Sequence, residues 1–212
     1  MCSSDLLAQI LELPLVDTGL FYRGVMVAAA RAGIAPDDIG ALIECARTTV
    51  VVIDTDPTHE HADSTAIVNG IEAGSALRDP ANAPLLASMS SIREVRESLL
   101  DAQRRLAEHG AVAVGRDCGT VVFPNAQLKL YLEASEDVRS RRRAHQLGTG
   151  ADVDSALIRG EVRARDEKDA SRVAAPMRPA DDAHVLDTGV LGIDAVVHTA
   201  LDLWESAAAV SE

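Results

Sequence analysis

The feature that most constrains the fold is an alternation of short apolar runs with longer segments of helical periodicity. The apolar runs lie at residues 13–16, 111–114, 128–132 and 185–186. The helical segments lie at residues 19–32, 92–106, 135–147, 153–170 and 193–204. Strands that alternate with helices predict a parallel sheet covered by helices on both faces, so we expect an α/β fold. Residues 35–75 interrupt the alternation and predict an inserted subdomain.

Two local signals predict where helices begin and end. Gly33 follows the helical segment 19–32 and is expected at its C-terminal cap, where a left-handed backbone is common. The stretch Ser91-Ile92-Arg93-Glu94 has the spacing of a capping box and predicts a helix that starts after Ser91.

Composition and charge exclude several classes of protein. The chain carries 20 Lys and Arg against 33 Asp and Glu, a net charge of −13, which argues against a nucleic-acid-binding face. No apolar run is long enough to span a membrane, and no secretion signal opens the chain. Cys2, Cys45 and Cys118 have no CxxC spacing, which argues against a disulfide scaffold or a zinc ribbon. We therefore expect a protein of the reducing cytoplasm without membrane or nucleic-acid partners.

Three polar clusters follow predicted strands. They are Asp17-Thr18-Gly19-Leu20-Phe21-Tyr22-Arg23, Gly115-Arg116-Asp117-Cys118-Gly119-Thr120 and Asp187-Thr188-Gly189. Ligands of open α/β sheets bind beyond the carboxyl ends of the strands, so these clusters are candidate site residues. Turn chemistry alone is the alternative, although two of the clusters carry an arginine that a turn does not require.

Arginine dominates the basic residues, since only Lys129 and Lys168 are lysines. Arg165, Asp169 and Arg172 share one face of a predicted helix, and further arginines crowd the preceding helical segment. One interpretation is a solvated face with ion pairs between neighbouring turns. The other is a local positive field suited to polyphosphate.

At this point the sequence resembles a known family. The strings L-V-D-T-G-L-F-Y-R at 15–23, V-G-R-D-C-G-T-V-V-F-P at 114–124, R-A-R-D at 163–166 and A-A-P-M-R-P-A-D-D-A at 174–183 are similar to bacterial cytidylate kinases. The resemblance implies transfer of the γ-phosphoryl group of ATP, bound with Mg²⁺, to CMP or dCMP. It implies a P-loop nucleoside monophosphate kinase-like fold with helices on both faces of a parallel sheet. We expect one kinase domain over residues 7–212, with a nucleoside monophosphate-binding insertion at 35–75 and a lid at 148–176.

The resemblance also implies roles for individual residues. Thr18 and Asp117 would read the cytosine edge, while Arg23, Arg96 and Arg116 would hold the CMP phosphate. Arg165 and Asp169 would reach the sugar and phosphate, and Arg172 would lie over the transferred group, so Arg165 and Arg172 are the expected catalytic residues. The remaining expected contacts are Tyr22 and Ser88 to CMP, and Arg142 and Arg143 to ATP.

The chemistry suits these roles. Phosphoryl transfer needs positioning and positive charge around the phosphate oxygens, with little acid–base work. Cytosine presents an exocyclic amine that a carboxylate such as Asp117 can accept from, and uracil lacks that donor.

The sequence departs from the family pattern at several places. It holds no Gly-Lys pair, so the Walker A loop G-x-x-x-x-G-K-[ST] that cradles ATP phosphates is absent, together with the first strand of the fold. Residues 1–6 are interpreted as a non-native scar, and the chain as written is expected to be inactive. The family's base-contacting serine aligns with Ala87, so Ser88 is assigned to that role only by a shift of one residue.

Two alternatives stay open. The chain could be another nucleoside monophosphate kinase, or a non-catalytic remnant that binds CMP without ATP chemistry. We expect CMP or dCMP and ATP as partners, a monomer, and no metal site formed by the protein's own side chains.

Overall fold

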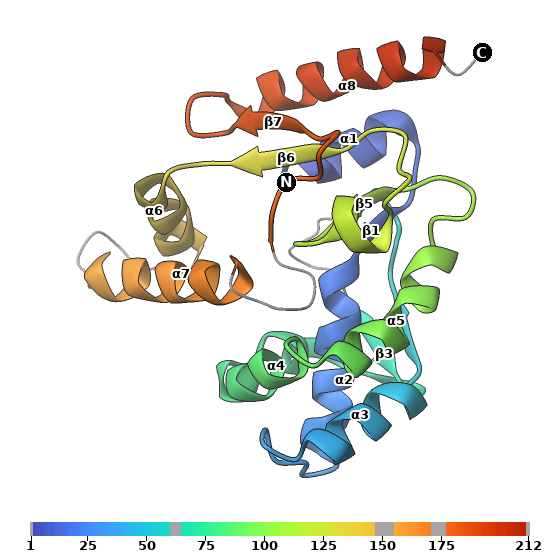
Figure 1. Ribbon diagram of the computed structural model, residues 1–212, viewed down its shortest axis with the longest axis vertical. Helices are drawn as coiled ribbons and strands as arrows, with labels where there is room; N and C mark the ends of the chain where they lie inside the picture. The colour runs from blue at the N-terminus through green and yellow to red at the C-terminus, as the bar shows by residue number, and fades with distance from the viewer. Residues whose placement is uncertain (1, 60–64, 147–154, 171–176, 211–212) are drawn as a thin grey trace. The chain divides into compact units, whose positions relative to one another are not determined.

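The structure is a computed structural model that describes residues 2–59, 65–146, 155–170 and 177–210. The chain divides into two compact units, Met1–Cys118 and Gly119–Glu212. Both units combine helices with parallel strand pairs, so the predicted α/β class is confirmed (Figure 1). The predicted lid, residues 148–176, lies partly outside the described residues, and the domain boundaries stay predictions.

The first unit is built on two parallel strands and the helices around them. Its helices and strands are α1 (Ser3–Leu11), β1 (Leu15–Asp17), α2 (Thr18–Arg31), α3 (Ile39–Thr48), β2 (Val51–Ile53), β3 (Ala66–Val68), β4 (Ile71–Glu72), α4 (Ala83–Met89), α5 (Arg93–Arg105) and β5 (Val112–Val114). Short 3₁₀ turns at Gly74–Arg78 and Pro80–Asn82 precede α4. Strand β1 pairs with β5 in parallel, with Asp17 opposite Val114 at their carboxyl ends.

Helix α2 begins directly where β1 ends, because Asp17 caps it. The Asp17 carboxylate accepts a hydrogen bond of 2.8 Å from the backbone N–H of Gly19. The helix then buries an apolar face that includes Leu20, Phe21, Val25 and Met26. Gly33, with φ of 67°, follows the helix end as its position predicted.

Residues 35–75 hold α3 and a three-stranded antiparallel sheet in the order β2-β3-β4. Asn69 and Gly70 join β3 to β4 with positive φ at both residues, the backbone of a two-residue hairpin turn. Gly24 lets α2 approach this sheet, because a Cβ on it would come within 2.6 Å of a methyl carbon of Val51.

Helix α5 packs against α2 (Figure 1). It carries the buried Arg96 and Gln103. The predicted capping box is wrong: Ile92 is the N-cap residue and no side chain caps this helix end. The Ser91 hydroxyl donates instead to the Ser88 carbonyl at 2.6 Å, so it satisfies the last turn of α4. Val95 and Leu99 bury the apolar stripe that periodicity predicted.

The second unit contains β6 (Leu130–Glu133), α6 (Glu136–Gln146), α7 (Ser155–Ala170), β7 (His184–Asp187) and α8 (Ile193–Val210). A π-helical turn at Cys118–Val122 links the two units. Strands β6 and β7 pair in parallel with Tyr131 opposite Val185. The helix predicted at 193–204 is present as α8, and it buries Val196, Val197 and Ala200, whereas Ile193 at its start is half exposed.

Candidate active site

The site begins where β1 and β5 end side by side. Thr18, the first residue of α2, is buried and donates its hydroxyl to the Val114 carbonyl at 3.0 Å. Gly115, the residue after Val114, lies close to Thr18. A Cβ at position 115 would be only 2.2 Å from the Thr18 hydroxyl oxygen. A side chain at residue 115 would therefore displace Thr18, so the glycine allows the loop after β5 to close onto α2.

Asp117 and Arg96 form a buried ion pair next to this contact. An Arg96 Nη2 donates to Asp117 Oδ2, and each side chain is only 7% exposed. The other terminal nitrogen of Arg96 donates to the Ser90 carbonyl at 3.0 Å, which fixes the guanidinium from a second direction. Two charges removed from water require such partners, because an unpaired buried charge is costly.

Tyr22 completes the setting of the Arg96 guanidinium. The guanidinium carbon lies 5.2 Å from the centroid of the buried Tyr22 ring, within the range of a cation–π interaction. Tyr22 stands one helical turn after Thr18 on α2, so one face of α2 reaches both the β5 loop and α5.

Cys118 closes the cluster beside Thr18. Its sulfur lies 3.6 Å from the Thr18 hydroxyl oxygen. Burial raises the pKa of this thiol to about 12, which its contact with the Thr18 hydroxyl only partly offsets. The thiol therefore stays protonated at neutral pH and acts as a packing residue, because the thiolate is the nucleophilic form of cysteine.

Gln103 belongs to the same cluster, although the sequence analysis did not identify it as a site residue. The side chain is fully buried on α5, and its amide nitrogen donates to the Thr18 carbonyl at 3.2 Å. The available signal was a polar residue among the apolar positions of a helical stripe, between Leu99 and Leu106. We call Thr18, Tyr22, Arg96, Asp117, Cys118 and Gln103 the polar cluster.

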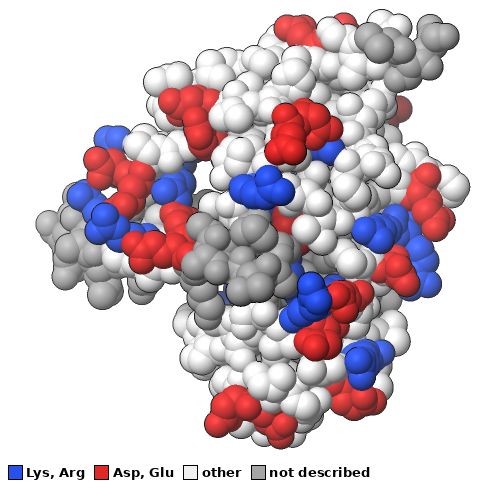
Figure 2. All heavy atoms as spheres, viewed as in Figure 1, with Lys and Arg blue, Asp and Glu red and all other residues white. Residues whose placement is uncertain are grey.

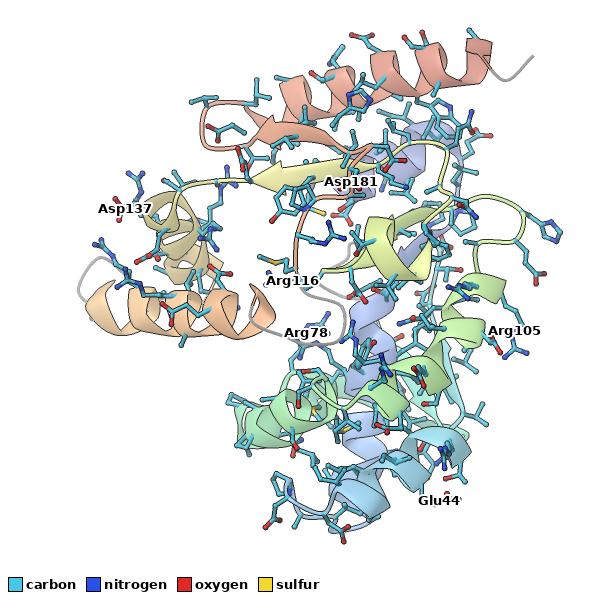
Figure 3. All side chains as sticks on the ribbon, in the orientation of Figure 1. Glu44, Arg78, Arg105, Arg116, Asp137 and Asp181 are labelled. Carbon is cyan, nitrogen blue, oxygen red and sulfur yellow. The ribbon has the colours of Figure 1, made fainter. Side chains whose placement is uncertain are left out.

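Two other predicted substrate residues of the first unit donate to backbone carbonyls. Arg23 donates to the Leu77 carbonyl at 2.8 Å, and the Ser88 hydroxyl donates to the Pro36 carbonyl at 2.5 Å. Arg116 stands between Gly115 and the buried Asp117 and is itself half-buried (Figure 3). The structure thus brings Thr18, Tyr22, Arg96 and Asp117 together in one cluster.

The predicted residues of the second unit lie on α6 and α7. Arg142 donates to the Thr188 hydroxyl at 3.0 Å and to the Thr188 carbonyl at 2.6 Å, while Arg143 is exposed. Arg165 and Asp169 fall on α7, but their side chains lie outside the described part of the structure. Arg172 lies outside the described residues altogether.

Helices α6 and α7 lie against each other and are joined by ion pairs. Arg139 pairs with Asp166, Arg159 with Asp137 at 3.1 Å, and Arg163 with Glu136 at 3.7 Å. Figure 2 shows positive and negative side chains interspersed on this part of the surface. These pairs join two helices, whereas Arg163 and Glu167, at 3.7 Å, form a pair between neighbouring turns of α7. The side chains of Arg165, Asp169 and Arg172 lie outside the described part of the structure, so both interpretations of that face stay open.

The described residues hold no group of three or more His, Cys, Asp and Glu side chains that could bind a metal ion. None of the helices in the described ranges has the length and apolar character needed to cross a membrane.

Comparison with known proteins gives this site its context. The family model for cytidylate kinase matches residues 3–206. A cytidylate kinase of Rhodococcus jostii is 39% identical over 197 residues, covering 92% of this chain and 84% of the relative. Those of Methylocella silvestris and Pseudomonas paraeruginosa are 41% and 40% identical, each over 92% of this chain and over 83% and 86% of the relative. The chain belongs to the cytidylate kinase family and is by that membership a nucleoside monophosphate kinase, a phosphotransferase.

Proposed function

We propose that the polar cluster binds the base of CMP or dCMP, the phosphoryl acceptor in a transfer from ATP. The observation that carries the proposal is the buried Arg96–Asp117 pair, held at the carboxyl end of β5 beside Thr18 and Tyr22. A carboxylate fixed by a guanidinium is a preorganised acceptor, and it sits where parallel sheets bind ligands.

Asp117 supplies the discrimination between pyrimidines in this proposal. A carboxylate has acceptor sites on both oxygens, so it can take a hydrogen bond from the cytosine amine while it accepts from Arg96. Uracil presents a carbonyl oxygen at the same position, which would face the carboxylate with no proton between them. Sites built around such a hydrogen bond reject analogues that lack it far more strongly than apolar pockets do.

The resemblance implied that Arg96 binds the CMP phosphate, but we propose a different role for it. Its guanidinium is buried and shared among Asp117, the Ser90 carbonyl and the Tyr22 ring. These contacts support a residue that orients Asp117 and the base, in place of a ligand to the CMP phosphate. The phosphate then falls to Arg23 and Arg116, whose planar guanidinium groups suit bidentate phosphate binding.

The remaining roles stay as proposed from the resemblance. Arg165, Asp169 and Arg172 would act on the sugar and the transferred group, and the exposed Arg143 is the candidate for ATP. Arg142 already bridges to Thr188, so we propose that it holds the β7 end in place. Mg²⁺ would arrive with ATP, since this ion is typically held by phosphates and water with few protein ligands.

Catalysis also requires a cradle for the ATP phosphates. The sequence contains no G-x-x-x-x-G-K-[ST] motif, whose backbone amides and lysine supply that cradle. We therefore propose that these 212 residues bind CMP without transferring phosphate to it at a substantial rate. The three unpaired cysteines support a reducing compartment, the cytoplasm, and we propose a monomer there.

Calorimetric titration of the chain with CMP, UMP and AMP tests the substrate assignment. We expect binding of CMP in clear preference to UMP and AMP. Asp117→Asn removes the acceptor charge and is expected to reduce the CMP-over-UMP ratio at least roughly tenfold. Asp101→Asn, an exposed change on α5, is the matched control and should leave the ratio unchanged.

The outcomes separate the alternatives. Equal binding of CMP and UMP would overturn the role of Asp117, and preferential AMP binding would favour another nucleoside monophosphate kinase. Formation of CDP from CMP and ATP by the purified chain would overturn the proposed inactivity, and it would also exclude the non-catalytic remnant.

A further inference from the structure

Gln103 holds the first residue of α2 from the side of α5. Its Nε2 donates to the Thr18 carbonyl, while the Thr18 hydroxyl is already used on the Val114 carbonyl. The orientation of the amide follows from chemistry, because a carbonyl only accepts and the Gln103 nitrogen must therefore face it. Thr18 is thus fixed between α5 and the end of β5.

Gln103 Oε1 is buried, and among the described residues no hydrogen bond reaches it. An unsatisfied buried acceptor costs folding free energy, whereas leucine or methionine would fill a similar volume without that cost. Stability alone therefore does not explain a glutamine at this position, whereas a need for its N–H donor does.

Gln103 and Arg96 fix α5 against α2 at two points. They stand seven residues apart on α5, close to two full turns, so they project from the same face. Gln103 meets Thr18, and Arg96 meets the Tyr22 ring one turn further along α2. A slide or rotation of α5 would break the first contact and move the Arg96 guanidinium off both Tyr22 and Asp117.

We infer that Gln103 is a positioning residue for pyrimidine recognition: its amide N–H fixes Thr18 and the register of α5 on α2, and so aligns the Arg96–Asp117 pair with the base. This inference rests on the proposed function of the polar cluster. Gln103 touches no substrate in this role and acts through Thr18 and Arg96.

The test compares Gln103→Met with the unchanged chain in CMP and UMP titrations and in thermal unfolding. We expect the variant to melt at or above the temperature of the unchanged chain, because the unpaired oxygen is gone. CMP affinity should fall roughly five- to tenfold, as for one lost hydrogen bond, and the CMP-over-UMP ratio should fall with it. Gln103→Leu, which also lacks an N–H donor, should lose the same discrimination.

Arg105→Met, an exposed change on the same helix, is the control and should alter neither property (Figure 3). An unchanged CMP-over-UMP ratio in both Gln103 variants would overturn the inference, whether or not they melt lower, because a merely structural residue would act that way. If the unchanged chain binds no CMP, the proposed function fails first and this inference fails with it. Loss of discrimination in the Asp117 variant but not in the Gln103 variants would leave the proposed function standing alone.

Discussion

The polar cluster of the first unit and the α6–α7 helix pair of the second both rely on arginine, but in opposite settings. Arg96 and Asp117 are almost fully buried, and several fixed groups hold the Arg96 guanidinium. Arg159 and Arg163 of α7 reach acidic partners on α6 while more than half exposed to solvent. An arginine therefore holds its partner in one fixed arrangement in the first region. In the second region, it makes ion pairs that water and salt weaken.

The difference shows what each region can do. A buried pair cannot be rearranged cheaply, because either charge left alone would lack solvation, and this rigidity suits the reading of a base edge. Exposed pairs exchange with water and salt at little cost, so α6 and α7 can lose one contact and keep their packing. Arg139 is intermediate: it pairs with the partly buried Asp166 and also donates to the Ala134 carbonyl at 3.0 Å.

The largest expected loss of stability comes from a substitution that breaks the buried Arg96–Asp117 pair. Asp117→Leu leaves the Arg96 guanidinium without its counter-charge and should lower the free energy of unfolding by roughly 3–5 kcal/mol. The double change Arg96→Met with Asp117→Leu removes both charges and should recover much of that loss. Urea unfolding of the two single variants and the double variant measures the coupling. Additive losses would show that the two charges do not depend on each other.

The strand and helix order was predictable because it depends on local periodicity. The apolar run at 111–114 predicted a buried strand, and the apolar spacing of Val95 and Leu99 predicted a helix. The structure has β5 and α5 at these places. The capping box at Ser91 failed because two helix ends lie within a few residues, and its hydroxyl serves the end of α4. A motif of four residues does not say which neighbouring helix it serves.

The site was predictable only in part, for a physical reason. Thr18 and Asp117 follow strands, so the rule for ligand sites in α/β sheets found them. The pairing of Arg96 with Asp117 spans 21 residues, and the contact between Gln103 and Thr18 spans 85. Such contacts arise from the packing of α5 on α2 and on the segment after β5, which composition and spacing do not encode.

A pH titration of stability sharpens the same comparison at Cys118. Burial raises the pKa of this thiol from about 9 to about 12, so the folded chain keeps the proton after the unfolded chain has lost it. The stabilising contribution is complete below pH 9 and declines as pH rises towards 12. The decline approaches about 1.4 kcal/mol per pH unit for one proton.

Cys118→Ala removes this contribution and provides the reference. The difference in unfolding free energy between the unchanged chain and the variant should be constant up to pH 9. It should then shrink through pH 10 and 10.5, as followed by urea unfolding at each pH. A difference that stays constant across the whole series would mean that the thiol is not buried as described.

The smallest effects are expected on α6 and α7, where one substitution can be made in two settings. Arg163→Gln removes two exposed pairs, to Glu136 and Glu167, and should cost less than about 0.5 kcal/mol, an effect that added salt abolishes. Arg139→Gln removes a partly buried pair and a carbonyl contact and should cost about 1 kcal/mol or more, with weak dependence on salt. Urea unfolding at low and high ionic strength separates the two. If both variants lost equal stability and responded equally to salt, burial would not be what distinguishes the arginines of this chain, and the contrast between the two regions would need another cause.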